Sequence, residues 1–403
     1  MVEAALTDLN GAPAESATGG TRGAAVAVIE VHRDIAGAAA AWDVLERSAP
    51  ASPYQTRAWV EAWLDTRGAG SGIMPMIIVA KDAVGQPVAL LPLGCWRSGF
   101  VTIAGFLGGR DSNCNQGLFR PGTEWNRRSI TALLRHGVAT ARAGVDVVLL
   151  QNQPTAWENM TNPLALLPRQ PSPSFGHKVD LLANPESFFR ATLSKDTRKK
   201  LRRKMERLGQ LGTVEHRQAK TELERHEVLD AFIRQRTARN LALGLGSGDL
   251  PELRRFLARA SSASRGPAAA EVHGLHCGNR IVATFIGTAH RSRFCGMSMS
   301  FDTDPALARC SPGELMISAM LGAKCKAGLT VFDLGIGEAR YKTIFCPTSE
   351  MLVDTIVPIT GRGLVFSWAE RLRLSAKRSI KQSDRAWTAA RTVRRGIAAL
   401  RRL

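Results

Sequence analysis

A stretch in the last quarter of the sequence, FDLGIGEARYK at residues 332–342, crowds ionisable side chains around two glycines. The apolar residues before it predict a strand, so Asp333 falls near the carboxyl end of that strand, where a sheet commonly opens into a cleft. If a helix follows, Glu338, Tyr341 and Lys342 are three and four residues apart and share one face. A carboxylate, a phenol and an ammonium group can together supply a base, an acid and a cation for an oxyanion.

The same residues allow a purely structural interpretation. Asp333 could cap the turn after its strand, and Tyr341 could close a hydrophobic core. Glu338 and Lys342 could form an ordinary ion pair one helical turn apart, worth about 0.2 to 0.5 kcal/mol. The pattern therefore predicts a reaction site as a hypothesis, with this structural role as its alternative.

A second motif, RCSPGEL at residues 309–315, predicts a strongly specified helix start. Ser311 is expected to cap the helix, Pro312 suits its first turn, and Glu314 completes an S-x-x-E capping box. Free amides at such a terminus can hold a phosphate, and Gly313 lets the backbone approach it closely. Because Glu314 also places a negative charge there, plain helix capping is the alternative to anion binding.

The elements around these motifs predict an α+β fold. In the first half, a strand near Val26 leads to helices in DIAGAAAAWDVLERSA and SPYQTRAWVEAWLDT, a three-strand meander, a helix near 125–143 and the strand VDVVLL. In the second half, helices at 185–208 and 221–240 lead to three strands, a helix at 312–327 and the strand LTVFDLG. This repeated order predicts a duplicated domain, each copy a mostly antiparallel twisted sheet flanked by helices, without a residue-level repeat.

The net charge of +19 is concentrated in two segments. Residues 195–207 hold eight basic and two acidic residues, and residues 362–403 hold twelve basic and two acidic residues. The rest of the chain is close to neutral, which argues against a basic nucleic-acid-binding globule. The aromatic and basic residues are also not interleaved as in such proteins, so nucleic acid is not an expected partner.

Cysteine usage and hydropathy indicate the compartment. Seven scattered cysteines without a CxxC pair suit reduced thiols, most of them small core residues. The histidines and cysteine of HGLHC at 273–277 have no second cluster that would complete a tetrahedral site, so no metal is expected. The N-terminus lacks the features of a signal peptide and no apolar run is long enough to cross a bilayer, which predicts a cytoplasmic protein.

The succession of a basic helix, a long helix ending in arginine, a three-strand meander, the SPG helix and FDLGIGEARYK resembles one acyltransferase family. It is similar to the CelD/BcsL-type acetyltransferases, a branch of the Gcn5-related N-acetyltransferase (GNAT) superfamily close to the FemAB-like transferases. The resemblance runs from about Trp42 to Lys342, and its most specific pieces are LSKDTRKKLRRKMERLGQLG, SPGELM and FDLGIGEARYK. It implies tandem GNAT-like domains and acetyl-CoA, or another acyl-CoA, as the acyl donor.

The resemblance also implies a donor site in the second domain, which carries both distinctive motifs. The helix that starts at Ser311 and Gly313 would face the CoA pyrophosphate. The sequence departs from the common loop R/Q-x-x-G-x-G/A of such enzymes, because only R-x-x-x-G survives between Arg309 and Gly313.

Catalytic roles follow from the same resemblance. Tyr341 falls where such acetyltransferases often keep a tyrosine, which implies that it protonates the CoA sulfur. Asp333 or Glu338 is then the base, and Lys342 stabilises substrate or oxyanion charge. In FemAB-like relatives, basic residues near the domain junction contact anionic substrates. Here this implies that the acceptor is contacted by Arg198, Arg202, Arg236 and Arg239. The alternative is that these arginines only form a solvated face.

The expected organisation has four parts. A disordered tail at 1–24 precedes an N-terminal GNAT-like domain at 25–180, a C-terminal GNAT-like domain at 181–360 and a basic amphipathic helix at 361–403. Apolar residues recur at helical spacing in the last part, from Leu364 and Trp368 to Trp387, Val393, Ile397 and Leu400. This pattern predicts either peripheral contact with the inner face of the membrane or a helix packed on the protein.

Three functions compete for this chain. The favoured one is transfer of an acyl group, expected to be acetyl, from acyl-CoA to a hydroxyl or amine of a polar, anionic acceptor. A role in cellulose or exopolysaccharide biosynthesis is implied only by the family resemblance. The alternatives are FemAB-like aminoacyl transfer to a cell-wall precursor and a non-catalytic, membrane-docked scaffold of the same fold.

Overall fold

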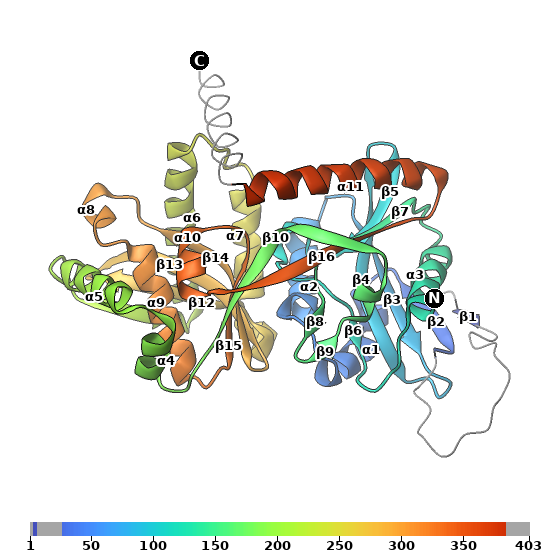
Figure 1. The fold of residues 1–403 in the computed structure, drawn as a ribbon, viewed down its shortest axis with the longest axis horizontal. Coiled ribbons are helices and arrows are strands. Elements are labelled where there is room, and N and C mark those ends of the chain that lie inside the picture. The colour runs from blue at the N-terminus through green and yellow to red at the C-terminus, as the bar shows by residue number, and fades with distance from the viewer. Residues whose placement is uncertain (1–2, 6–25, 384–403) are drawn as a thin grey trace. The chain divides into compact units, whose positions relative to one another are not determined.

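The structure, a computed structural model, describes residues 3–5 and 26–383 of the 403-residue chain. The described residues form two compact units. The first contains residues 3–5, 26–64, 68–173 and 351–376, and the second contains residues 65–67, 174–350 and 377–383. Figure 1 shows a sheet with helices in each.

The first unit is built on a mostly antiparallel sheet. Its strands in sheet order are β1 (Glu3–Ala5), β2 (Val28–His32), β3 (Met74–Lys81), β4 (Pro87–Ser98), β5 (Val101–Phe106), β7 (Val147–Pro154) and β16 (Thr348–Pro358). Only β5 and β7 pair in parallel among these strands. The short β6 (Leu118–Phe119) pairs with β4, while β8 (Ala156–Trp157) and β9 (Met160–Thr161) form a separate hairpin.

Three helices of the first unit are α1 (Ile35–Ser48), α2 (Arg57–Trp63) and α3 (Arg127–Ala141). Close packing explains a glycine in α3, because a Cβ on Gly137 would lie 2.4 Å from Cδ1 of Ile78 on β3. Trp59 and Trp63 of α2 lie four residues apart and are both buried.

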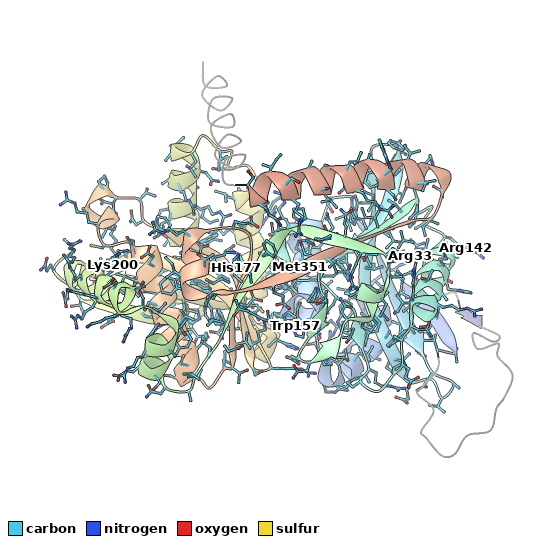
Figure 2. The ribbon with its side chains drawn as sticks, in the orientation of Figure 1. Arg33, Arg142, Trp157, His177, Lys200 and Met351 are labelled. Atoms are coloured by element: carbon cyan, nitrogen blue, oxygen red, sulfur yellow. The ribbon has the colours of Figure 1, made fainter. Side chains whose placement is uncertain are left out.

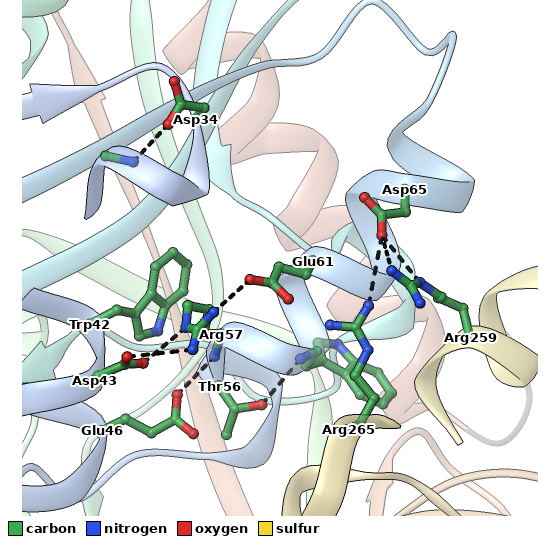
Figure 3. Close-up of polar contacts among 12 residues, drawn as sticks. Asp34, Trp42, Asp43, Glu46, Thr56, Arg57, Glu61, Asp65, Arg259 and Arg265 are labelled. Atoms are coloured by element: carbon green, nitrogen blue, oxygen red, sulfur yellow. Dashed lines mark hydrogen bonds and ion pairs between the residues drawn. The ribbon is translucent and has the colours of Figure 1, made fainter. Parts of the chain in front are cut away.

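Arg57 ties α1 to the start of α2 (Figure 3). Its Nε donates to Asp43 Oδ1 at 2.9 Å and its Nη1 donates to Glu61 Oε1 at 3.0 Å. Its backbone N–H donates to Glu46 Oε2 at 2.8 Å, which satisfies an amide that the first turn of α2 cannot pair.

The second unit repeats the pattern. Its strands in sheet order are β10 (Arg169–Asp180), β15 (Val331–Ile336), β14 (Arg293–Phe301), β13 (Arg280–His290), β12 (Glu271–Cys277) and β11 (Val214–Gln218). Here β14 and β15 are the parallel pair, and the other neighbours are antiparallel. The helices are α4 (Pro185–Thr192), α5 (Lys195–Gly209), α6 (Glu222–Ala242), α7 (Leu250–Ala260), α8 (Pro305–Ala308), α9 (Pro312–Lys326) and α10 (Arg340–Phe345).

Helices α6 and α9 cover opposite faces of this second sheet. Ser300 of β14 donates its hydroxyl to Gln235 of α6 at 2.6 Å. Its neighbour Phe301 points the other way and packs near the start of α9, as expected where successive side chains of a strand alternate. The core on the α9 side includes stacked Phe294 and Phe332, whose ring centroids lie 5.2 Å apart.

Each sheet is completed by a strand from the other half of the sequence. β10 follows β7 in the chain but pairs with β15, and β16 follows β15 but pairs with β7. The structural division therefore differs from the expected limits 25–180 and 181–360. Residues 351–360 join the first unit because the backbone of β16 pairs with β7 between Leu352 and Pro358.

Two segments of the structure differ from the helices expected from the sequence. The helix expected at 185–208 is interrupted, because Leu193 has an extended backbone and Ser194 caps a new helix by accepting from the Thr197 N–H. The segment expected at 361–403 begins with α11 (Gly361–Gln382). Trp387, Val393, Ile397 and Leu400 lie outside the described residues, as does the predicted tail at 1–24 apart from β1.

All seven cysteines are buried free thiols, which confirms their predicted core role. Within residues 3–5 and 26–383, no helix is long and apolar enough to cross a membrane. The same residues contain no group of three or more His, Cys, Asp or Glu side chains placed to hold a metal ion.

Candidate active site

The candidate site begins where β14 and β15 stop pairing. The two strands are in register only from Arg293 to Cys295 and from Val331 to Asp333. A register shift against β13 follows directly in β14, around Met297. The carboxyl ends of both strands are thus unpaired with each other, and such an opening beyond the ends of parallel strands is a common ligand site.

The start of α9 lies beside the free end of β14. A Cβ on Gly313 would lie 3.0 Å from Phe301 Cδ1 and 3.6 Å from Met299 Cε, so glycine permits this close approach. The predicted capping box is wrong. Ser311 adopts a left-handed backbone, with φ 48° and ψ 61°, and its side chain makes no capping hydrogen bond.

Glu314 is paired with a residue that the sequence did not single out. Its Oε2 lies 2.6 Å from Nζ of Lys204 on α5, so it does not reach back to the Ser311 backbone as the capping box requires. The ion pair offsets the negative charge that Glu314 brings to the start of α9. An anion at this helix start therefore meets less repulsion than the sequence suggests.

Tyr341 of α10 is brought together with the arginines at the end of α6. Burial raises the pKa of the Tyr341 phenol, while the positive charges of Arg239 and Arg236 oppose that rise. The Arg239 guanidinium lies over the Phe301 ring, 5.6 Å from its centroid. Tyr341, Arg239, Phe301 and Gly313 therefore surround the open end of β14, and the phenol keeps its proton at neutral pH.

Asp333 is fully engaged in the fold of the strand exit. Its Oδ2 lies 2.5 Å from Nη2 of Arg293, and both side chains are about nine-tenths buried. Its Oδ1 accepts from the Gly335 N–H at 2.6 Å. Gly335 has φ +70°, a conformation that glycine adopts without strain, so Asp333 stabilises a tight turn in the backbone of β15.

Glu338 and Lys342 do not share a helix face. α10 begins at Arg340, so Glu338 precedes the helix and the spacing argument that grouped it with Lys342 is wrong. Nζ of Lys342 donates to the carbonyl oxygens of Ile336, at 2.7 Å, and Gly335, at 3.2 Å. Glu338 Oε2 lies 3.3 Å from Nζ of Lys381, whereas its Oε1 is buried without a hydrogen-bond partner.

Lys342 is nevertheless electrostatically coupled to the carboxylates. Burial lowers the pKa of Lys342 to about 8, and the charges of Asp333 and Glu338 partly oppose that fall. The ammonium and neutral forms of this side chain are therefore both accessible near neutral pH.

His177 of β10, labelled in Figure 2, was not among the site residues predicted from the sequence. Its ring is buried and neither nitrogen has a hydrogen-bond partner. Burial lowers the pKa of His177, and the nearby charge of Lys342 lowers it further. No local sequence pattern connects the histidine of the SFGHKVD stretch with Lys342, because β10 and α10 lie far apart in the sequence.

The remaining predicted arginines lie elsewhere on the second unit. Arg198 lines a cavity of about 320 Å³ between α4, α5 and α9. Arg202 is largely exposed, with its Nε 3.7 Å from Glu206 one turn later on α5. Arg236 lies over the Phe232 ring at 5.7 Å from its centroid and influences Tyr341, so only the α6 arginines are associated with the open strand end.

Comparison with known families now adds to this geometry. Residues 195–343 match the family described as an acetyltransferase (GNAT) domain. The second unit carries a GNAT acetyltransferase domain. Its matched range contains α5, the open end of β14, the start of α9 and Tyr341. No curated protein matches the chain.

Solved structures share the fold over both units of the chain. FemX is 10% identical with a TM-score of 0.56, over 79% of this chain and 96% of its own. A conserved protein of unknown function from Bacteroides thetaiotaomicron is 13% identical with a TM-score of 0.52, over 82% of this chain and 100% of its own. The C-terminal domain of a proposed lysylphosphatidylglycerol synthetase from Agrobacterium fabrum is 14% identical with a TM-score of 0.50, over 84% of this chain and 97% of its own. The predicted α+β class, with a mostly antiparallel sheet flanked by helices in each unit, is confirmed.

Proposed function

We propose that the chain transfers an acyl group, expected to be acetyl, from acyl-CoA to a hydroxyl or amine of a polar acceptor. The observation that carries this proposal is the link from Tyr341 through Arg239 and Phe301 to Gly313 at the start of α9, within the range that matches the GNAT domain. The donor's phosphates would lie at the Gly313 end of α9, beside Ser311, where helix amides and the dipole favour an anion.

The proposed reaction contains two proton transfers, one from the acceptor to a base and one from Tyr341 to the leaving thiolate. A base takes the proton of the acceptor hydroxyl or amine, which attacks the thioester carbonyl carbon; the carbon–sulfur bond breaks, and Tyr341 donates its proton to the departing thiolate. Glu338 is the preferred base, because its Oε1 has no hydrogen-bond partner while both oxygens of Asp333 are engaged. Lys342 would favour the negative charge that develops at the carbonyl oxygen.

The acceptor is proposed to be anionic. Arg236 and Arg239 at the open strand end support this, because guanidinium groups suit phosphate and carboxylate. Membership of the CelD/BcsL branch, and with it a role in cellulose or exopolysaccharide biosynthesis, is part of the proposal. A cytoplasmic location suits an enzyme that uses acyl-CoA.

Aminoacyl transfer is the second candidate. It is supported by the likeness in fold to FemX and to a domain of a proposed lysylphosphatidylglycerol synthetase. The donor would then be aminoacyl-tRNA and the acceptor a cell-wall precursor. A non-catalytic scaffold of the same fold is the third, and it predicts CoA binding without turnover.

Calorimetric titration with acetyl-CoA tests the donor directly. We expect saturable binding by the wild-type chain and roughly tenfold weaker binding by Arg309→Glu, because the exposed Arg309 stands just before the proposed phosphate site. Arg255→Glu is the matched control, since it makes the same charge change at an exposed position on α7. Absence of binding by the folded wild type would reject acyl-CoA as the donor in favour of aminoacyl-tRNA.

The pH dependence of turnover tests Lys342. We expect kcat/KM to fall as pH rises through about 8, because the ammonium group loses its proton there. The folded pKa lies below the ordinary value of 10.5, so the unfolded chain binds more protons between these values and stability should rise with pH over that range. Lys342→Met should remove both effects. An unchanged alkaline limb in this variant would contradict the role of Lys342.

A further inference from the structure

We propose that α4 and α5 form a docking surface for an anionic phospholipid membrane. This surface consists of the small cavity between α4, α5 and α9 and of the cations at it, Arg190 and Arg198. It does not depend on the proposed acyl transfer, because no residue that lines the cavity has a role in that reaction. Figure 1 shows α4 and α5 on the outer side of α9.

The first support is an uncompensated positive charge. Of the eight basic residues of α5, Arg202 and Lys204 have acidic partners, at Glu206 and Glu314. Within the described part of the chain, no acidic partner occurs for six others: Lys195, Arg198, Lys199, Lys200, Arg203 and Arg207. Spacing places Lys199, Arg203 and Arg207 along the side of α5 opposite the buried Leu201 and Leu208.

The second support is a partly apolar cavity with two arginines at it. The cavity encloses about 320 Å³, and Phe189, Leu193 and Leu201 provide its apolar lining. Arg190 and Arg198 stand at the same cavity, and the Nε of Arg198 is buried without a hydrogen-bond partner. The acidic Glu186 and the hydroxyl-bearing Ser318 also line it. An apolar pocket beside unpaired guanidinium groups suits the phosphate and upper acyl chain of one lipid.

The third support is apolar exposure next to the charges. Met205 lies seven residues after Arg198, so it shares that side of α5, and it is 37% exposed. Leu211, just beyond the helix, is 55% exposed. A helix that presents cations together with exposed apolar side chains is typical of binding in the headgroup region of a bilayer. Lys200 extends outward from the same helix in Figure 2.

A membrane explains these features better than a nucleic acid does. Phosphates of either partner would satisfy the cations, but a polynucleotide would leave the apolar cavity and Met205 without a partner. No aromatic side chain is exposed on α5 for stacking on bases. An acyl chain fills the apolar part and the headgroup meets the arginines.

The test uses the full chain and two kinds of vesicle. One contains phosphatidylcholine alone, and the other also contains about 30% of the anionic lipid phosphatidylglycerol. Hydrogen exchange is read peptide by peptide, so that contacts of α4 and α5 are separated from any contact made by residues 384–403. We expect slower exchange over residues 185–209 with the anionic vesicles only. Unchanged exchange over 185–209, or equal protection by neutral vesicles, would overturn the proposal.

Charge-matched variants sharpen the test. Arg190→Gln with Arg198→Gln should weaken vesicle binding by roughly fivefold for each residue, since each basic residue near an anionic surface contributes a similar increment. Lys199→Gln with Arg203→Gln, on the side of α5 away from the cavity, should weaken vesicle binding less. The control pair Arg234→Gln with Arg255→Gln makes the same charge change on exposed positions of α6 and α7 and should leave vesicle binding unchanged. Equal losses in the cavity pair and the control pair would contradict a localised surface.

A competing partner is tested in the same way. Single-stranded RNA should protect residues 185–209 less than anionic vesicles do, and the reverse order would replace the membrane with a nucleic acid. Acetyl-CoA binding, measured on every preparation, keeps the two proposals apart. A wild-type chain that binds acetyl-CoA but not anionic vesicles would reject only the docking surface.

Discussion

Replacing Tyr341 with phenylalanine is expected to lower kcat for acyl transfer by roughly a hundredfold, the lower end of what a general acid contributes. The phenol keeps its proton at neutral pH, because burial raises its pKa. It can therefore protonate a departing thiolate. Steady-state kinetics with acetyl-CoA and a model acceptor would measure the loss, and calorimetry should find acetyl-CoA binding changed by no more than about twofold.

A matched control separates chemistry from packing in this prediction. Tyr54 is the only other tyrosine of the chain and is buried in the first unit. Tyr54→Phe makes the same chemical change and should leave kcat unaltered. A Tyr341→Phe enzyme that keeps wild-type kcat would show that the phenol only closes the core, which is the structural alternative.

Replacing Asp333 with alanine is expected to lower the free energy of unfolding by about 3 kcal/mol, because it leaves a buried guanidinium without its main partner. Arg293 keeps a weaker contact with Glu350, whose carboxylate oxygen lies 3.6 Å away, so the loss should fall at the lower end of the range for broken buried pairs. The Gly335 N–H also loses its acceptor. Urea unfolding of both proteins measures the difference.

An exposed pair offers the control for Asp333. Arg280 is about half exposed and bonds Asp302, so Asp302→Ala should cost less than about 1 kcal/mol. Asp333→Asn retains an acceptor for the Gly335 N–H and should be less destabilising than alanine. If Asp333→Ala abolished turnover while the unfolding curve stayed at the wild-type position, Asp333 would be the base and the structural account would be wrong.

Sequence patterns located the motifs of the site but not their partners. The SPG helix start, the strand LTVF and the helix carrying Tyr341 lie where local spacing predicts them. The capping box failed because Ser311 has a left-handed backbone, and Glu314 meets Lys204 from a helix more than a hundred residues earlier. Such distant charge pairs leave no local signal.

The sequence by itself determined the α+β class, the repeated element order and the chemical character of FDLGIGEARYK, because hydrophobic periodicity and turn residues act over a few neighbours. Tertiary structure decided the rest. It completed each sheet with a strand from the other half, engaged both oxygens of Asp333, and placed His177 beside Lys342. These outcomes depend on contacts between residues far apart in the chain, where burial and charge pairing outweigh local preference.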